Sequence, residues 1–435
     1  MAPTKPLLLD GSTGEGGGQL VRLAVALSAV TGQPIRIVNI RANRTRSRPV
    51  GKRGSVHVTG GGLKNQHVAA IKCLADATRA ETTGLSAGSA TLTFTPTLPP
   101  SRLPRRPLKI VPESDASSAM LIFQAVLPFL LFADVEEGQG VEVEIHGGTN
   151  TSWSLNYEYM DLVLLPTLEA RFGVRVEREL RRRGWSQGPA ASGCVWVKVY
   201  PVRKGESITP LQLPIPLGKE RDTRGPRDHF EVESVDVALV VPLRLLEPLQ
   251  TALARDIAGV FPSAPEIDFR VVEDSGHQAR IYVLLVAKSP TGLRWGRDVL
   301  HSPPKGSSAN PTSMADALSR LAVKQLVEEV DSRGAVDVYL QDQLVCFQAL
   351  AAGRSSFARH GDGRGGGVDV DGVAGAPGPT PDIEGDGLRR EKTHEPFGHG
   401  SMHTKTARWV AAQLLPGVQF FNKGDVVEGA GIRFA

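Results

Sequence analysis

Apolar and polar positions alternate along the N-terminal part of the chain in a way that predicts one compact unit. Apolar residues recur at helical spacing over 19–30 and 65–78, and they alternate with polar residues over 35–40 and 91–95. A short apolar segment at 7–9 precedes the first helix. The pattern therefore predicts a strand, helix, strand, helix and strand in that order.

A similar order recurs further along the chain. Two more helices are predicted, each followed by strand-like alternation, and a last helix and strand set begins at 339–350 and resumes over 404–421. Three loosely similar units indicate an α+β fold class, an α/β sandwich of repeated units. The predicted helices of the middle unit are 117–132 and 157–172, and its strands are 141–145, 174–176 and 194–200.

Two regions interrupt this order. Residues 201–332 carry strands and helices of their own, which predicts a smaller inserted α/β domain and leaves 1–200 and 333–435 as the large domain. Residues 361–387 hold ten glycines and lack hydrophobic periodicity. With their flanks, about 358–398, they are expected to form a disordered surface insertion.

The overall charge does not identify a partner. The 50 Lys and Arg residues against 46 Asp and Glu give a formal net charge of +4, so any basic site must come from local clustering. A hydrophobic content of 41% excludes a wholly disordered chain. Glycine is in excess, with 47 residues, about 11% against a usual value of roughly 7%.

Cysteine spacing and apolar runs indicate the compartment. Cys73, Cys194 and Cys346 are too far apart for a disulfide framework or a CxxC metal site. The apolar run at 119–133 is shorter than the roughly 20 residues that a membrane span needs, and the N-terminus lacks the apolar core of a signal peptide. We expect an intracellular protein, nuclear or cytoplasmic, that is neither secreted nor membrane-bound.

The sharpest local motif is Glu-Gly-Gly-Gly-Gln at 15–19, directly before a predicted helix. Glycines at a helix N-terminus let backbone N–H groups approach phosphate oxygens, and a carboxylate such as Glu15 suits a Mg²⁺ ion that bridges to them. The segment matches neither a P-loop nor GxGxxG. A tight turn with an exposed glutamate fits the same residues.

Six basic residues and no acid lie within 41–53. Arginine binds phosphate bidentately, so Arg41 and Arg44 are candidates for holding a nucleic acid, although many such runs are solvated loops. His403 precedes a helix-like segment and is a candidate nucleophile, since a histidine nitrogen can form a covalent intermediate. A metal cluster of His403 with His394 and His399 is less favoured, because no cysteine accompanies them.

Taken together, these motifs resemble the RNA 3′-terminal phosphate cyclase family. The resemblance rests on Asp-Gly-Ser-Thr-Gly-Glu-Gly-Gly-Gly-Gln over 10–19 and on segments in the family's order: 40–44, 62–67, Gln124, 147–150, 339–344 and 403–406. It implies a large domain of three βαβαββ units like those of an initiation factor, with a smaller inserted domain.

The resemblance also implies an ATP-dependent reaction. His403 would attack the α-phosphate of ATP to give a histidine–AMP intermediate, and AMP would pass to an RNA 3′-phosphate as an anhydride. The 2′-hydroxyl would then close a 2′,3′-cyclic phosphodiester and release AMP. RNA with a 3′-phosphate is the implied partner, with ATP and Mg²⁺ or Mn²⁺ required and no obligate protein partner indicated.

The resemblance assigns a role to each site residue. Glu15 would hold the metal, and Asp342 would orient His403. Gln124 and the segment Tyr339, Leu340, Gln341, Asp342 and Gln343 would position ATP, while Arg22, Arg41, Arg44 and Gln66 would bind the RNA terminus.

The sequence departs from the family pattern at an insertion over 45–61 and at 152–155, which reads Ser-Trp-Ser-Leu near the expected adenine pocket. Two other readings remain: a cyclase-like ribosome-biogenesis factor, which shares the fold but lacks adenylation chemistry, and a catalytically silent RNA-binding scaffold, which is a different class of protein. The presence of His403, with Glu15 and the 339–343 element, favours the cyclase.

Overall fold

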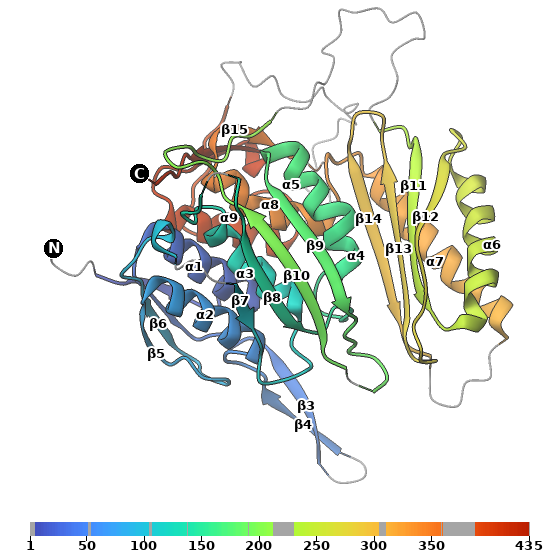
Figure 1. Cartoon of the computed structure of the whole chain (residues 1–435), viewed down its shortest axis with the longest axis horizontal. Helices are drawn as coiled ribbons and strands as arrows, with labels where there is room; N and C mark the ends of the chain where they lie inside the picture. Colours follow the sequence, from blue (N-terminus) through green and yellow to red (C-terminus); the bar gives the residue numbers. More distant parts are fainter. Residues whose placement is uncertain are drawn as a thin grey trace, which may run out of the picture.

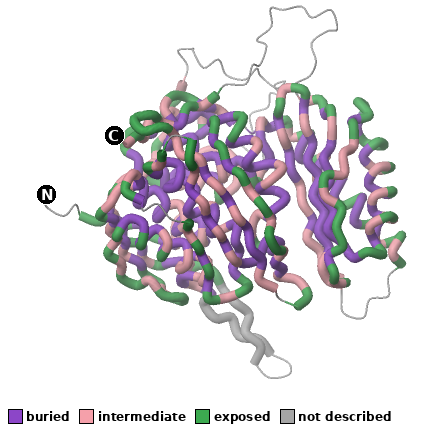
Figure 2. Tube along the Cα trace, in the orientation of Figure 1, coloured by how far each residue is buried: buried purple, intermediate pink, exposed green. Residues whose placement is uncertain are grey.

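The computed structural model describes residues 5–50, 54–103, 107–136, 138–189, 191–211, 230–303, 310–357, 359 and 388–434. Helices and small mixed sheets alternate through this part of the chain (Figure 1). Figure 2 shows that the buried residues gather inside the molecule, where helices and sheets pack against each other, and that exposed residues lie along its outside.

The first unit forms a four-stranded sheet in the order β1-β2-β6-β5. Strands β1 and β2 run parallel because α1 connects them, and the remaining neighbours are antiparallel. Its elements are β1 (Leu7–Asp10), α1 (Gly18–Thr31), β2 (Ile35–Val38), α2 (Asn65–Thr78), β5 (Glu81–Thr83) and β6 (Leu92–Thr95).

The second unit repeats this topology in the order β7-β8-β10-β9, with one parallel pair followed by two antiparallel pairs. The same strand order and directions in two units support the repeat that the sequence pattern predicts. Its elements are β7 (Leu108–Ile110), α3 (Ala119–Leu130), β8 (Val141–Gly147), α4 (Tyr157–Tyr159), η2 (Met160–Leu164), α5 (Leu165–Phe172), β9 (Arg175–Arg182) and β10 (Gly193–Tyr200).

The segment predicted as one helix over 157–172 contains a π-helical turn, Met160–Leu164. Pro166 has no N–H to bond the carbonyl of Leu162, so the regular helical ladder cannot continue there. That carbonyl instead accepts a hydrogen bond of 3.3 Å from the Arg294 guanidinium on β14 (Arg294–His301). The irregular turn thereby ties the second unit to the inserted sheet.

The third unit has a three-stranded sheet in the order β15-β17-β16, which matches the last three strands of the other units. On the free edge of β15 the Ala352 N–H donates to the carbonyl of Ile208 at 2.7 Å, where the first strand would stand. Its elements are α8 (Val338–Leu350), β15 (Ala352–Ser356), α9 (Met402–Leu414), β16 (Gln419–Phe421) and β17 (Val426–Ala430).

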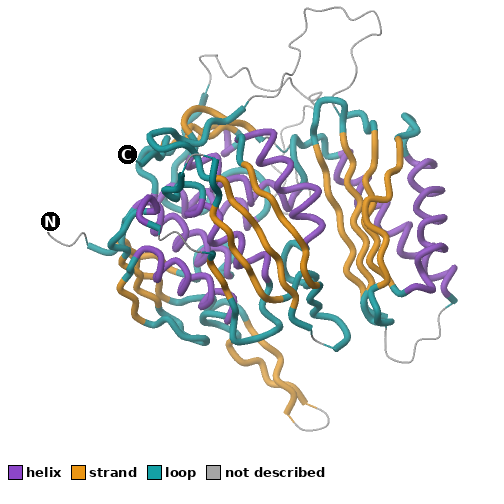
Figure 3. The backbone as a smooth tube through the Cα atoms, in the orientation of Figure 1, coloured by secondary structure: helices purple, strands orange, loops and turns teal. Residues whose placement is uncertain are grey.

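The inserted sheet has the order β12-β11-β13-β14 and carries α6 (Leu243–Val260) and α7 (Pro311–Asp331) on one face (Figure 3). Along β11 (Ser234–Val241), Val237 and Leu239 pack with these helices, whereas Ala238 and Val240 belong to the core of the large domain. Burial on both faces explains the unbroken apolar run of β11. The other strands are β12 (Glu266–Asp274) and β13 (Ile281–Lys288).

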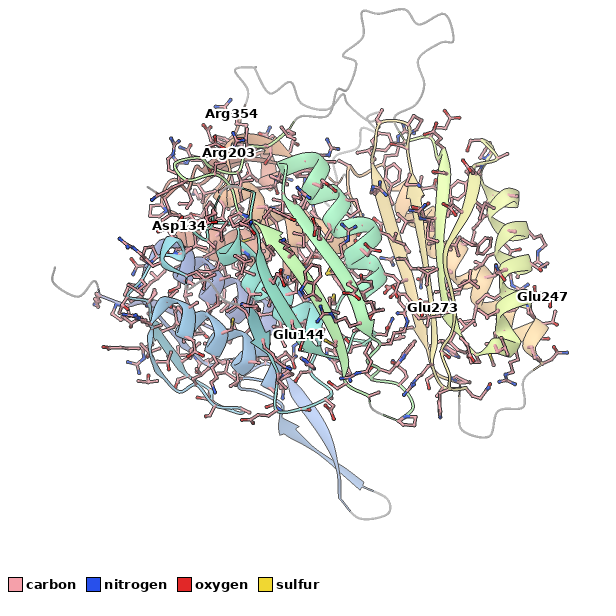
Figure 4. The ribbon with its side chains drawn as sticks, in the orientation of Figure 1. Asp134, Glu144, Arg203, Glu247, Glu273 and Arg354 are labelled. Atoms are coloured by element: carbon pink, nitrogen blue, oxygen red, sulfur yellow. The ribbon has the colours of Figure 1, made fainter. Side chains whose placement is uncertain are left out.

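A polar link accompanies this packing at one edge. Arg183, just after β9, donates to Glu273 on β12 at 2.7 Å and also pairs with the buried Glu158 on α4. Glu273 is labelled in Figure 4 on the inserted sheet, facing the second unit.

Helices from all three units pack together. Helix α1 contacts α2, α3 and α9, and α9 contacts α8; the labels of these helices lie close together in Figure 1. Residues separated by almost four hundred positions thus meet at one place, for example Glu15 and Thr406. In the described part of the chain, none of the helices has the length and apolarity to cross a membrane.

The predicted α+β fold class is confirmed, and the helix predicted over 65–78 has those bounds. The predicted elements missed β12, β14, the short strands β5, β7, β15 and β17, and the two strands of a hairpin over 45–59. The basic run continues into a hairpin of β3 (Thr45–Val50) and β4 (Gly54–Thr59), which projects from the body (Figure 1).

The insertion predicted over 361–387 lies outside the described residues. The end of its wider predicted range, 388–398, is described, and Phe397 there is buried.

Candidate active site

The glycine loop before α1 is docked against α9. Gly14 has a φ of 65°, and a Cβ at this position would lie 2.2 Å from the Thr406 hydroxyl, so only glycine fits. The backbone N–H of Glu15 donates to the same hydroxyl at 3.0 Å. Because Thr406 lies one helical turn from His403, this contact places the Glu15 carboxylate beside the imidazole.

His403 stands in the first turn of α9, which Ser401 caps by accepting a hydrogen bond from the Thr404 N–H at 3.2 Å. The imidazole is half-exposed, and its Nδ1 lies 2.8 Å from Oε1 of Gln19. The other end of the Gln19 amide, Nε2, donates to the Asp342 carboxylate at 2.7 Å.

This relay determines which nitrogen of His403 is free. A carboxylate accepts hydrogen bonds, so Asp342 turns the NH₂ of Gln19 toward itself and leaves Oε1 facing the imidazole. An amide oxygen accepts as well, so Nδ1 of His403 carries the proton and donates it. The lone pair at Nε2 is then available for attack.

The surroundings of His403 favour the neutral form of its imidazole. Burial lowers the pKa of His403 below its usual value, and Arg22 and Arg44 act in the same direction, while Asp342 opposes them. Burial also raises the pKa of Asp342. A neutral imidazole is the form that acts as a nucleophile.

A chain of side-chain hydrogen bonds continues from Asp342 to the basic residues. Gln343 donates to Asp342 at 3.1 Å, Gln124 donates to Gln343 at 2.8 Å, and the Arg22 guanidinium donates to Gln124 at 2.7 Å. The chain joins α8, α3 and α1, one helix from each unit. Each amide has both ends used, which fixes its orientation.

Two cavities adjoin His403. The first, of about 410 Å³, is lined by Gln124, Tyr339, Asp342 and Gln343 together with apolar side chains such as Met160. Leu340 and Gln341 do not line it: both are buried, and Gln341 donates to the carbonyl of Phe357 at 3.5 Å. These two residues of the predicted ATP-binding segment lie on the buried face of α8, away from the cavity.

The second cavity, of about 880 Å³, is basic. It is lined by all four residues expected to bind the RNA terminus, Arg22, Arg41, Arg44 and Gln66, and also by Glu15. Burial lowers the pKa of Arg22 to about 10, so it keeps its charge at neutral pH. We call the first space the amide cavity and the second the basic cavity.

The two cavities share a wall. Arg22, Leu121, Trp153 and His403 line both of them. Of the residues predicted to bind RNA, Arg41, Arg44 and Gln66 line only the basic cavity and Arg22 lines both. The residues predicted to bind ATP that reach a cavity line only the amide cavity: Gln124, Tyr339, Asp342 and Gln343.

Glu15 has the features of a cation ligand. One carboxylate oxygen pairs with the Arg44 guanidinium, whereas the other, Oε2, is buried without a hydrogen-bond partner, 3.6 Å from Nδ1 of His403. An unsatisfied buried carboxylate oxygen is costly unless a cation or proton reaches it. Mg²⁺ often takes a single carboxylate together with substrate phosphates, so the residues fit such an ion.

Three residues that lie in the quoted motifs, but were given no role of their own there, belong to the site. Gln19 orients His403, and Trp153 lines both cavities. His67 is buried in the basic cavity, where burial, Arg22 and Arg41 lower its pKa well below the usual value. A Cβ on Gly18 would lie 2.5 Å from its ring. A signal for Gln19 exists in the sequence, since it is a polar residue at the start of an apolar helix. The structure shows that it is buried there.

A family model described as RNA 3′-terminal phosphate cyclase matches residues 13–362. Its match ends before His403, so the placement of His403 in the site depends on the fold.

Curated relatives are similar over most of their length. A protein of Thermococcus sibiricus named RNA 3′-terminal phosphate cyclase is 33% identical over 349 residues, which is 80% of this chain and 86% of the relative. Proteins of the same name from Thermococcus onnurineus and Pyrococcus furiosus are 33% and 31% identical, each covering 81% of this chain and 88% of the relative. The chain belongs to the RNA 3′-terminal phosphate cyclase family of enzymes.

Proposed function

We propose that this protein uses ATP to convert an RNA 3′-terminal phosphate into a 2′,3′-cyclic phosphodiester. The observation that carries the proposal is the position of His403. Its Nδ1 is bonded to Gln19, its Nε2 has no hydrogen-bond partner among the described residues, and its ring forms part of the wall between the amide cavity and the basic cavity. The names of the relatives point to the same activity.

In the first step, ATP occupies the amide cavity with its base among the apolar side chains. Nε2 of His403 attacks the α-phosphorus, a P–N bond forms, and the bond to the leaving pyrophosphate breaks. The imidazole gains positive charge as it reacts. Asp342 stabilises that charge through Gln19, which holds the Nδ1 proton.

In the second step, an oxygen of the RNA 3′-phosphate attacks the phosphorus of the histidine-bound AMP. The P–N bond breaks, the neutral imidazole is restored, and an anhydride joins RNA to AMP. Arg22, Arg41 and Arg44 hold the terminal phosphate in the basic cavity, with Gln66 beside them. Their charge lowers the repulsion between the two phosphoryl groups.

In the last step, the 2′-hydroxyl of the terminal ribose attacks the activated 3′-phosphorus. The cyclic phosphodiester forms, the bond to AMP breaks, AMP leaves, and the hydroxyl proton passes to AMP or to water. Where Mg²⁺ or Mn²⁺ is bound, Glu15 would hold it and the ion would neutralise charge on the ATP phosphates.

Labelling with ATP tests the nucleophile. Protein incubated with α-phosphate-labelled ATP and Mg²⁺ should gain one AMP group in an acid-labile, base-stable bond, as expected of a phosphoramidate. His403→Ala should abolish the label. His394→Ala, which changes a highly exposed histidine outside both cavities, is the matched control and should label as the wild type does.

The cyclase proposal fails if the wild type gains no label with either Mg²⁺ or Mn²⁺, or if His403→Ala labels equally well. A parallel assay with an RNA 3′-phosphate should show AMP release and a phosphatase-resistant end. An RNA-binding scaffold would bind the RNA and show neither.

A further inference from the structure

Trp153 is an exposed indole at the boundary of the two cavities. Its residue exposure is 49%, high for so large an apolar side chain. It lines the amide cavity and the basic cavity, as do Arg22 and His403. None of the steps above uses it.

The loop that carries Trp153 is fixed by its neighbours. The Thr151 N–H donates to the Asn156 side chain at 2.7 Å, and Asn156 in turn donates to Asp298 on β14 at 2.8 Å. The hydroxyl of Ser154 lies 2.6 Å from that of Thr151 and 2.7 Å from that of Ser118. An aromatic ring held out from such a loop loses little conformational freedom when a ligand covers it.

The two cavities differ in what the indole would add. The amide cavity already has apolar and aromatic walls, including Phe123, Leu155, Met160 and Tyr339. Among the described residues lining the basic cavity, Trp153 is the only Trp, Tyr or Phe. Phosphate is held there by arginines, but the base attached to the same nucleotide has no other large ring to lie against.

We propose that Trp153 stacks on the 3′-terminal nucleobase of the RNA while Arg22 and its neighbours hold the terminal phosphate. The inference rests on the proposed function. Proteins that bind single-stranded RNA combine basic grooves with aromatic platforms, and stacking tolerates any base because each has a π-face. Trp153 would thus supply base binding without sequence specificity.

Abasic RNA isolates this contact. We compare an oligonucleotide ending in an ordinary 3′-nucleotide phosphate with one whose last residue lacks the base, and measure the Kd of each by fluorescence anisotropy. Loss of the stack should weaken wild-type binding roughly five- to 150-fold. Trp153→Ala should weaken binding of the ordinary RNA by a similar factor and remove the discrimination between the two oligonucleotides.

Two further variants control for folding and for general loss of aromatic surface. Trp153→Phe keeps a π-face and should retain most of the discrimination. Trp196→Ala removes an indole on the outer face of β10, outside both cavities, and should retain all of it. Circular dichroism checks that each variant is folded.

The outcome also distinguishes the RNA base from the adenine of ATP. If Trp153→Ala raises the KM for ATP in the adenylation of His403 while base discrimination persists, the indole packs on adenine and the proposal is wrong. The stacking proposal is also wrong if Trp153→Ala still discriminates between the ordinary and the abasic oligonucleotide and nothing else changes. Because the Kd values need no turnover, failure of the stacking proposal is separable from failure of the cyclase proposal.

Discussion

At the scale of single residues, the site depends on how one amide is oriented. Gln19 is placed between a carboxylate and an imidazole, so its two ends can satisfy both neighbours in only one orientation. The arrangement resembles the role of the aspartate in a catalytic triad, with an amide interposed between the acid and the histidine. Asp342 is therefore a positioning residue that acts through Gln19.

Replacing Asp342 tests this relay. Asp342→Asn removes the charge that favours the imidazolium and frees Gln19 to turn around. Loss of a charged hydrogen bond of about 2 kcal/mol predicts a roughly thirtyfold slower adenylation of His403. The exposed carboxylate variant Asp331→Asn is the control and should adenylate normally.

The same variant should change the dependence on pH. Adenylation requires neutral His403, so its rate falls as pH drops through the pKa of that residue, which lies below the usual value. Asp342 raises this pKa, so its removal should move the midpoint to lower pH. Single-turnover labelling from about pH 5 to 8 measures the shift; a midpoint that stays fixed or rises would contradict the relay.

At the scale of elements, α9 carries the proposed nucleophile, His403, in its first turn, where helix ends fray most easily. The Ser401 cap holds this turn, and Thr406 fixes the adjacent glycine loop to it. Removing the Ser401 cap should therefore disturb the position of His403 strongly and lower the stability of the whole protein only slightly.

Ser401→Ala is expected to cost about 1 kcal/mol of stability and to slow adenylation at least several-fold. Asn310→Ala removes the equivalent cap of α7, where Asn310 accepts from the Thr312 N–H at 2.8 Å, far along the chain from the site. It should cost similar stability and leave adenylation unchanged. Thermal unfolding measures the stability of both variants, and ATP labelling measures their adenylation. Equal adenylation of the two variants would mean that the Ser401 cap does not position His403.

Sequence pattern predicted elements well where one face is apolar. Helix α2 has apolar residues along one face, and strand β10 alternates between buried and partly exposed residues; both elements were predicted. Strand β12 was missed because it lies at a sheet edge and most of its residues are polar or exposed, as in Glu266 and Asp274. The π-turn at 160–164 arises from Pro166 and a partner on β14, which local periodicity cannot reveal.

Motif reasoning named the residues that line the two cavities more readily than those that support them. Arg22, Arg41 and His403 are charged or nucleophilic and stand out in the sequence. Gln19 and His67 act through contacts with residues far along the chain, so their importance depends on the fold. Leu340 and Gln341 share a motif with Tyr339 but face the opposite side of α8, into the core.

At the scale of the whole molecule, one buried carboxylate joins three parts of the fold. Asp337 caps α8 by accepting from the Tyr339 and Leu340 N–H groups, each at 2.9 Å. It also accepts from the Tyr159 hydroxyl of the second unit at 2.6 Å and from the Gly296 N–H of β14 at 2.9 Å. The inserted sheet and two repeated units thus share a single acceptor.

Asp337→Ala should destabilise the protein by about 2–4 kcal/mol, because several buried donors lose their acceptor together. The exposed variant Asp76→Ala should change stability by less than about 0.5 kcal/mol. Chemical unfolding measures both. A loss under about 1 kcal/mol for Asp337→Ala would mean that water or another group replaces the carboxylate.

The shared wall of the two cavities limits how the protein can diversify. If the amide cavity binds ATP and the basic cavity binds RNA, as we propose, a residue that lines one cavity alone can change to suit a different nucleotide or a different RNA end without affecting the other substrate. A change at Arg22, Leu121, Trp153 or His403 alters both binding spaces at once. Attempts to engineer new specificity should therefore begin with residues that face only one side, such as Met160 or Gln66, and leave the wall intact.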